Sequence, residues 1–380
     1  MTDLTAYSGA RIFDGVAWYE NAALVVDGEN IHSIGPVHPG AKQVVLDGGY
    51  LVPGFVDLQV NGGGGHLIGE GTGVAELALV CDTHAQFGVT SLLPTLITNT
   101  PEVTQAVLSA GAAATRQRMP GFLGLHLEGP HLAVSRKGAH DPKLIRPMEE
   151  SDLVLLERAR VELPHLVVTV ATESCTPEQI QRLTRAGIVV SLGHTDASFE
   201  AASAAIRAGA SMATHLFNAM SQMGNREPGL VGAVLHHGTV SAGLIADGIH
   251  VHPATLASAL RAKKSPGQIF LVSDSMSQAG TDLALFEFGG RTVFRRDGAL
   301  RLGDGTLAGA DLTMDAAVRK LTNLGFGLSV ALEMATRAPG RALRHSALGH
   351  LAPGLPADLV SFGSGVYVRA TWRRGSLCPR

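Results

Sequence analysis

Three residues far apart in the chain, Glu128, His194 and His215, together make a typical metal-binding set. Each of them lies where an apolar, strand-like run ends. Two imidazoles and one carboxylate suit Zn²⁺, or Fe²⁺ and similar ions, and leave coordination positions open for water. Such an ion lowers the pKa of a bound water and supplies hydroxide at neutral pH. The set therefore indicates metal-assisted hydrolysis.

A further carboxylate, Asp274, ends the last strand-like run, across the mouth of the predicted site. It is placed there to take the proton of an attacking water and to pass it later to a leaving amine. Each residue taken alone has a plainer interpretation, because a strand-end histidine is commonly structural and Glu128 or Asp274 could cap a helix. Their joint placement at the same end of successive strands favours a catalytic site.

The segment that precedes Gly62 bears on the number of metal ions. Many metal hydrolases on a barrel carry Asp-x-His-x-His at the end of the first strand, whereas here Gln59 and Asn61 stand at the two histidine positions. Neutral amide oxygens are poor zinc ligands compared with imidazole. We therefore predict one divalent ion per chain. Whether Gln59 and Asn61 only bond the turn or contact water or substrate stays open.

These side chains need a scaffold that brings many strand ends together. The middle of the chain holds eight apolar runs typical of strands: Leu51–Val60, Thr90–Leu93, Gly121–Leu127, Leu166–Ala171, Ile188–Leu192, Ser211–His215, Ser241–Ala246 and Gln268–Val272. Helical spacing is found between them at Val74–Phe87, Thr100–Arg118, Pro177–Ala186 and Ser198–Ala208. This α/β alternation predicts a (β/α)8 TIM-like barrel, with its active site at the carboxyl ends of the strands.

An open doubly wound sheet is the alternative fold. Its usual phosphate-binding fingerprint is missing, because the Gly-rich stretch Asn61–Gly65 is not followed by a helix start at the required spacing. After the eighth run, Phe286–Gly309 predicts one or two hairpins, with turns at Asp297-Gly298 and Asp304-Gly305. A last helix is expected over Leu328–Arg337.

Both ends of the chain are rich in short β-like runs, such as Ala22–Asp27 near the start and Ala357–Phe362 near the end. Two such ends around a long barrel predict a small β-sandwich domain formed from both chain ends. We expect this domain to comprise residues 1–51 together with 346–380, and the barrel to comprise 52–345.

Composition excludes several classes of protein. The 380 residues are 45% hydrophobic and 17% charged, with a net charge of −3, which argues against a general nucleic-acid binder. No apolar stretch is long enough to predict a membrane span, and the start of the chain does not resemble a signal peptide. The 3 cysteines, Cys81, Cys175 and Cys378, are far apart, which favours a cytoplasmic protein.

Beyond these single residues, the sequence resembles the N-acetylglucosamine-6-phosphate deacetylases of the amidohydrolase superfamily along nearly its whole length. The segments that carry the resemblance are Pro53 to Gly62, His126 to Pro130, Lys137 to His140, Gly193 to Thr195, Thr214 to Met220, Arg226 to Gly229, Asp247 to His250 and Leu307 to Ala310. The run His-Leu-Phe-Asn-Ala-Met close to Arg-Glu-Pro-Gly is the most specific of them.

The resemblance implies a role for each matching residue. Glu128, His194 and His215 would hold the metal, Asp274 would be the general base and then the general acid, and His140 would donate to the acetyl carbonyl oxygen. A phosphorylated amino sugar would be bound by Asn218, Ala219, Arg226, His250, His140 and Ala308. In the family the arginine at position 226 comes from the neighbouring subunit, which implies a homodimer.

The sequence departs from the family pattern at two places and leaves other hypotheses open. His131 follows Gly129-Pro130 where some relatives carry a bulkier residue, and Asp274 lies between two serines. The expected reaction converts N-acetylglucosamine 6-phosphate to glucosamine 6-phosphate and acetate. Alternatives are another N-acetylhexosamine 6-phosphate, an N-acyl amino acid, or a metal-free scaffold, although such scaffolds usually lose the ligands that are present here. His126 should face the same side of its strand as Glu128, as support or as barrel core.

Overall fold

A computed structural model describes residues 4–379, and its centre is a barrel of parallel strands. The 8-stranded sheet follows chain order and consists of β8 (Phe55–Val60), β11 (Val89–Ile97), β12 (Leu125–Glu128), β13 (Leu166–Val170), β14 (Val189–Leu192), β15 (Met212–Ala213), β16 (Ser241–Leu244) and β17 (Ile269–Leu271). The predicted TIM-like barrel is confirmed, and the open doubly wound alternative is wrong.

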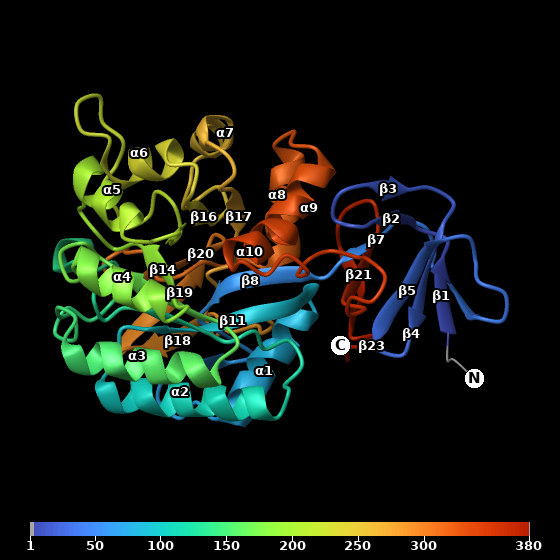
Figure 1. Cartoon of the computed structure of the whole chain (residues 1–380), viewed down its shortest axis with the longest axis horizontal. Coiled ribbons are helices and arrows are strands. Elements are labelled where there is room, and N and C mark those ends of the chain that lie inside the picture. Colours follow the sequence, from blue (N-terminus) through green and yellow to red (C-terminus); the bar gives the residue numbers. More distant parts are fainter. Residues whose placement is uncertain (1–3, 380) are drawn as a thin grey trace.

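The helices that follow the strands form an outer layer around the barrel (Figure 1). They are α1 (Val74–Ala85), α2 (Pro101–Arg116), α3 (Glu150–Glu162), α4 (Pro177–Arg185), α5 (Phe199–Arg207), α6 (Gly229–His236), α7 (Pro253–Ala262) and α8 (Met314–Asn323). The side chains of Thr100, Thr176 and Ser198 cap α2, α4 and α5 by accepting a backbone N–H of the first turn. These caps explain why the starts predicted from the sequence agree with the structure.

The barrel closes between β8 and the residues that follow β17. Val60 and Ser275 form a parallel bridge, the N–H of Asn61 donates to the carbonyl of Ser275 at 2.9 Å, and the N–H of Asp274 donates to the carbonyl of Gln59 at 3.0 Å. The buried carboxylate of Asp57 accepts the N–H of Ser273, with its oxygens 3.2 and 3.3 Å away. This closure (the barrel seam below) joins the first strand end to the last.

Gly54 separates two strands that the apolar pattern of the sequence predicts as one. β7 (Tyr50–Pro53) belongs to a different sheet from β8, and the predicted run Leu51–Val60 is therefore wrong as a single strand. A Cβ on Gly54 would lie 2.1 Å from Oγ1 of Thr90, so that only glycine lets the chain pass from one sheet to the other at this point.

The ends of the chain form two further sheets that pack on each other. One has the order β5 (Asn30–Gly35), β4 (Ala23–Asp27), β1 (Leu4–Ser8), β6 (Lys42–Val45), and the other has the order β23 (Ser376–Leu377), β22 (Val368–Arg373), β21 (Leu359–Phe362), β7, β2 (Arg11–Phe13), β3 (Trp18–Tyr19). Side chains from both sheets, including Leu24, Ile31, Leu51 and Trp372, share one apolar cluster. The small β-sandwich from both ends is confirmed, whereas the exact division at 51/52 and 345/346 stays a prediction; residues 1–3 and 380 lie outside the described residues.

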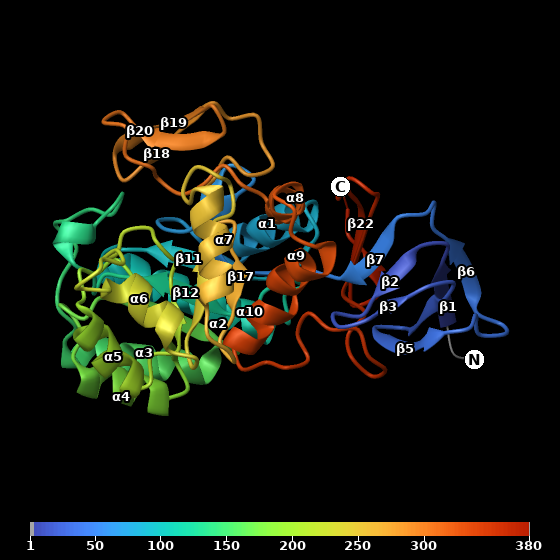
Figure 2. The ribbon, with the colours of Figure 1, turned by 90° about the horizontal axis from the view of Figure 1, so that it is seen from above.

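A three-stranded antiparallel sheet stands over the barrel (Figure 2). It comprises β18 (Leu285–Phe288), β19 (Arg291–Arg296) and β20 (Ala299–Leu302), with the predicted turn at Asp297-Gly298 between the last two. Phe286, Phe288 and Val293 pack it onto Met276 and Ala308.

The predicted last helix is two helices, α9 (Leu328–Ala335) and α10 (Arg337–Ala342), because Thr336 between them leaves helical backbone geometry with ψ −81. Along residues 4–379, every helix is too short or too polar to cross a membrane.

The barrel seam predicts an unusual pH dependence of stability. Burial raises the pKa of Asp57 to about 7, from an ordinary value of 3.8. Folding therefore favours the protonated form, so this residue's stabilising contribution is complete below about pH 4 and is lost as the pH rises to about 7. We expect the free energy of unfolding of the wild type to fall, relative to that of Asp57→Asn, across this window, as measured by urea denaturation at a series of pH values.

The matched control for this prediction is Asp304→Asn. A backbone hydrogen bond from Thr306 lowers the pKa of this exposed carboxyl, so its difference curve should have the opposite slope. A wild-type protein that gains stability over Asp57→Asn as the pH rises would contradict the assignment of Asp57 as a carboxyl destabilised by ionisation.

Candidate active site

Glu128, His194 and His215 meet at the carboxyl ends of the barrel strands, as the sequence predicts. Oε1 of Glu128 lies 3.2 Å from Nε2 of His194 and 3.0 Å from Nε2 of His215, and the two Nε2 atoms are 3.1 Å apart. All three side chains are buried. These residues form a metal-ligand set within residues 4–379, with one donor atom from each within 4.8 Å of the others.

The hydrogen bonds around His194 show which nitrogen faces the set. Its Nδ1 lies 2.8 Å from the carbonyl oxygen of Arg136, which can only accept, so Nδ1 carries the proton and Nε2 presents a lone pair. A lone-pair nitrogen and a carboxylate oxygen about 3 Å apart repel each other unless a proton or a metal cation lies between them. Tetrahedral zinc ligands at about 2.05 Å from the ion are about 3.3 Å from each other, so the donors fit a divalent ion of this size.

The charges at this set are strongly coupled. Burial by itself would raise the pKa of Glu128, but hydrogen bonds and charge from His194 and His215 hold it well below its usual range. Gln59 contributes as well, because its Nε2 donates to Oε1 of Glu128 at 3.2 Å. The carboxylate is therefore kept ionised inside the barrel, in the state that binds a metal ion.

Asp274 lies beside this set and lines the same cavity. Burial raises its pKa to about 6, and the negative charge of Glu128 acts in the same direction. A divalent cation held by the neighbouring ligands acts the opposite way and favours the ionised form. Oδ1 of Asp274 accepts the side-chain N–H of Asn61 at 2.7 Å. Its position suits a carboxylate that takes up and releases a proton.

His140 lies next to the ligands on a loop after β12. Its ring is 4.5 Å from that of His194, centroid to centroid, and its Nδ1 lies 2.8 Å from Oγ1 of Thr98. Burial lowers the pKa of His140 to about 3. Its Nε2 lies 3.9 Å from Oε2 of Glu128, too far for a hydrogen bond. In the neutral tautomer in which Nδ1 of His140 accepts from Thr98, Nε2 carries the proton and can donate it to a ligand.

The cavity around these residues has a volume of about 510 Å³ and is partly covered by the three-stranded sheet. Asn218, Ala219 and His250 line it, together with Phe288 and Arg301 from that sheet. Ala308 does not: it is fully buried in the apolar cluster beneath the sheet, while its neighbours Leu307 and Gly309 face the cavity. The segment Leu307–Gly309 thus lies at the cavity, and a role for Ala308 in substrate binding stays a prediction.

Arg226 is another predicted residue that the single chain does not bring to the cavity lining. It is exposed on the loop before α6. Oε1 of its neighbour Glu227 accepts the backbone N–H groups of Phe199 and Gly229. A guanidinium on such a loop is free to contact another subunit.

The supporting contact of Asp247 was not foreseen from the sequence, whereas His126 was expected as support or barrel core. Asp247 accepts from Nδ1 of His250 at 2.6 Å and from two backbone N–H groups of the same loop, which fixes the His250 ring. His126 is not a ligand: its Nδ1 faces the carbonyl of Leu58 at 3.1 Å and its Nε2 faces Oγ1 of Thr169 at 2.7 Å. It belongs to a buried chain of hydroxyls that links neighbouring strands under the site.

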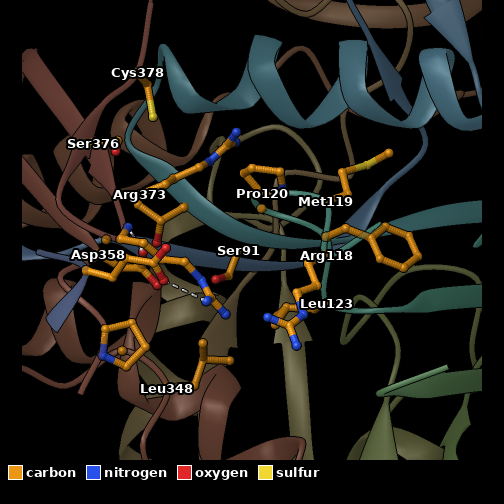
Figure 3. A pocket seen from close by; sticks show the side chains of 18 of the residues that line it. Ser91, Arg118, Met119, Pro120, Leu123, Leu348, Asp358, Arg373, Ser376 and Cys378 are labelled. Atoms are coloured by element: carbon orange, nitrogen blue, oxygen red, sulfur yellow. Dashed lines mark hydrogen bonds and ion pairs between the residues drawn. The ribbon is translucent and has the colours of Figure 1, made fainter. Parts of the chain in front are cut away.

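Another cavity, of about 640 Å³, lies at the opposite end of the barrel, between the strand starts and the small sandwich. Figure 3 shows Arg118, Arg373 and Asp358 around it. Arg373 is already paired with Asp82 at 2.9 Å and bonded to backbone carbonyls. The metal-ligand set is remote from this cavity, which therefore has no part in the chemistry of the strand ends.

Comparison with known proteins agrees with this geometry. The chain is 44% identical, over 87% of its length and 84% of the relative's, to an N-acetylgalactosamine-6-phosphate deacetylase of Shewanella sp. (strain ANA-3). It is 34% identical, over 92% of its length and 94% of the relative's, to an N-acetylglucosamine-6-phosphate deacetylase of Haemophilus influenzae.

Solved structures are similar as well. The N-acetylglucosamine-6-phosphate deacetylase of Pasteurella multocida superposes with a TM-score of 0.95 at 34% identity, covering 99% of this chain and 100% of that one. A mutant of the Mycobacterium smegmatis enzyme in complex with N-acetyl-D-glucosamine-6-phosphate has a TM-score of 0.90 at 30% identity, covering 100% of both chains. A model of the amidohydrolase family matches residues 50–377. With its barrel, its strand-end ligands and these relatives, the chain belongs to the amidohydrolase family.

Proposed function

We propose that this protein hydrolyses the acetamide of N-acetylglucosamine 6-phosphate to glucosamine 6-phosphate and acetate. The observation that carries the proposal is the joint geometry of Asp274, His140 and the ligand set in one cavity, on a chain whose relatives are deacetylases of N-acetylhexosamine 6-phosphates. The cavity, at about 510 Å³, is large enough for a sugar phosphate.

Glu128, His194 and His215 would hold one divalent ion, Zn²⁺ or Fe²⁺. When bound, such an ion lowers the pKa of a water and polarises the acetyl carbonyl. Asp274 takes one proton from the attacking water as the water oxygen bonds to the carbonyl carbon. Nε2–H of His140 donates to the carbonyl oxygen, where negative charge develops. Asp274 then gives its proton to the nitrogen as the C–N bond breaks, which leaves acetate and a free amine.

The phosphate would be bound by His250, by Asn218 and Ala219, and by Arg226 of a second copy of the chain, in a homodimer. His250 is held by Asp247, and Asn218 and Ala219 line the cavity. Arg226 is exposed and unable to serve its own subunit's cavity in this conformation, which supports its delivery to the neighbouring site. The buried free thiols of Cys81 and Cys175 suit work in the reducing cytoplasm.

The galactose epimer is a second candidate substrate. A specific observation favours it: the relative at 44% identity is named for N-acetylgalactosamine 6-phosphate, while relatives named for the glucose epimer are 28% to 37% identical. The two substrates share the acetamide and the phosphate and differ only at one sugar hydroxyl, so the chemistry described above serves both.

The deciding assay compares three substrates on one preparation: N-acetylglucosamine 6-phosphate, its galactose epimer and unphosphorylated N-acetylglucosamine. We expect acetate release from a phosphorylated substrate with kcat/KM at least about 100-fold above that for the unphosphorylated sugar, because a phosphate bound by Arg and His forms charge-assisted hydrogen bonds. Arg226→Ala should remove most of this difference in kcat/KM. Arg207→Ala on α5 is the control and should leave the difference unchanged. Equal activity without the phosphate would disprove the substrate class.

Replacing the proposed acid and base tests the mechanism. Asp274→Asn keeps the size of the side chain but cannot accept the proton of water, so we expect kcat to fall by about 10³-fold or more. Metal content should stay at the wild-type level, since Asp274 is outside the ligand set. A variant that retains most of its kcat would rule out this role.

Metal titration tests the ligand set. Protein stripped with a chelator should lose activity and regain it on addition of Zn²⁺ or Fe²⁺, with saturation near one equivalent per chain, because Gln59 and Asn61 replace the histidines of a second site. Glu128→Gln should weaken binding by about 10- to 100-fold or more, since it removes the only charged ligand of the set. Tight binding of two equivalents would contradict the single-ion assignment.

A further inference from the structure

We propose that Asn61 orients Asp274 with one end of its side-chain amide and receives the N–H of the scissile acetamide with the other. The proposal rests on the proposed deacetylation and adds a residue to it. Asn61 is 4% exposed, lies just after β8 and lines the active-site cavity. It stands where a metal-binding histidine would be expected, so its type requires an explanation other than metal binding.

The contact with Asp274 fixes the orientation of the amide. Nδ2 of Asn61 lies 2.7 Å from Oδ1 of Asp274. If the amide were rotated, its oxygen would face a carboxylate oxygen at this distance, and two acceptors would repel each other. The nitrogen therefore points at Asp274, and its N–H donates to Oδ1.

This hydrogen bond gives the two carboxylate oxygens of Asp274 different roles. The amide nitrogen is only a donor, so Oδ1 always acts as an acceptor along this line. Oδ2 has no hydrogen-bond partner among residues 4–379, so both of its lone pairs are available for a proton taken from water. We therefore assign the uptake and release of the proton to Oδ2.

The backbone holds this pair rigidly. The N–H of Asn61 donates to the carbonyl of Ser275 at 2.9 Å, and the carbonyl of Asp274 accepts from Ala310 at 2.8 Å. Asp274 has a φ of +49, a conformation that a non-glycine residue adopts at an energetic cost. Its surroundings therefore hold the carboxylate in place against a local preference, as expected where the orientation of the side chain matters.

The other end of the amide is without a partner. Oδ1 of Asn61 is fully buried and accepts no hydrogen bond within the described part of the chain. A buried acceptor without a donor is unfavourable, and a ligand that supplies one is bound more tightly for it. Asn61 and Asp274 line the same cavity, and the leaving nitrogen has to come within reach of Asp274. Before C–N cleavage that nitrogen carries one N–H, which is the kind of donor that Oδ1 of Asn61 lacks.

Gln59 provides the internal comparison. Alternation along the strand puts it on the same side as Asn61, but its Nε2 donates to the metal ligand Glu128 at 3.2 Å. The two amides therefore serve different carboxylates, one that holds the ion and one that moves the proton.

The test compares Asn61→Ala with the wild type on two substrates: the N-acetyl sugar phosphate and its analogue with an acetoxy group in place of the acetamide. The ester has no N–H. On this substrate, the Asn61→Ala change can therefore lower the rate only through the orientation of Asp274. We expect kcat/KM to fall by about 10- to 100-fold on the ester, as for one hydrogen bond to a charged group, and about 10-fold further on the amide. Metal content should stay unchanged.

Asn99→Ala is the matched control, since Asn99 also follows a barrel strand and bonds backbone, at Thr100, but does not line the cavity. It should keep near wild-type kinetics. Equal losses on both substrates would overturn the contact with the N–H. Losses below about 3-fold on both would overturn the whole proposal.

A crystal structure of metal-loaded protein gives a readout that needs no turnover. The wild type should keep Asn61 within hydrogen-bond distance of Asp274, and Asn61→Ala should show the Asp274 side chain rotated or in two conformations. An unmoved Asp274 would overturn the orienting role even if the wild type hydrolysed neither substrate. Inactivity of the wild type on both would instead overturn the proposed deacetylation.

Discussion

The barrel seam is the contact on which the active site depends. Backbone hydrogen bonds join Asn61 to Ser275 and Asp274 to Gln59, and the carboxylate of Asp57 accepts from Ser273. Without this closure, the end of the first strand and the end of the last would be at opposite edges of an open sheet. With it, the carboxylate of Asp274 lies beside the candidate metal ligands, which come from strands in the middle of the order. The geometry of the reaction is therefore a property of the closed ring of strands.

Burial then sets the chemistry at those strand ends. Two carboxylates, Glu128 and Asp274, share a cavity with the same imidazoles nearby but have opposite pKa shifts. Glu128 is stabilised as an anion by two direct histidine contacts, whereas Asp274 has a single amide donor and a repelling neighbour. One carboxylate is fixed in charge and the other can change it, a division of roles that suits hydrolysis.

The candidate metal-ligand set could be found from the sequence because strand ends in a barrel converge. Glu128, His194 and His215 end separate apolar runs, and that placement was enough to predict that they meet. What the sequence did not reveal depends on loops and on backbone atoms. The backbone carbonyl of Arg136 selects the tautomer of His194. Every residue type has such a carbonyl, so the identity of residue 136 does not indicate this contact.

The same limit applies to the fold. The eight strands were recognised from their apolar runs, but the change of sheet at Gly54 was not, because it results from the approach of Thr90, which is far along the chain. Asp247 belongs to a segment that carries the family resemblance, Asp247 to His250. Its hydrogen bond to His250 requires a turn whose shape no local sequence pattern specifies. Arg226 is exposed and outside the cavity lining of the single chain, and no local pattern in the sequence indicates this position.

The sandwich built from both ends has a consequence for synthesis on the ribosome. β7, which leads directly into the first barrel strand, is paired on one side by β21 (Leu359–Phe362). Its partner is more than 300 residues later in the chain, and loop-closure entropy makes that pairing slow. The sheet that anchors the start of the barrel can be completed only after the whole barrel has been synthesised.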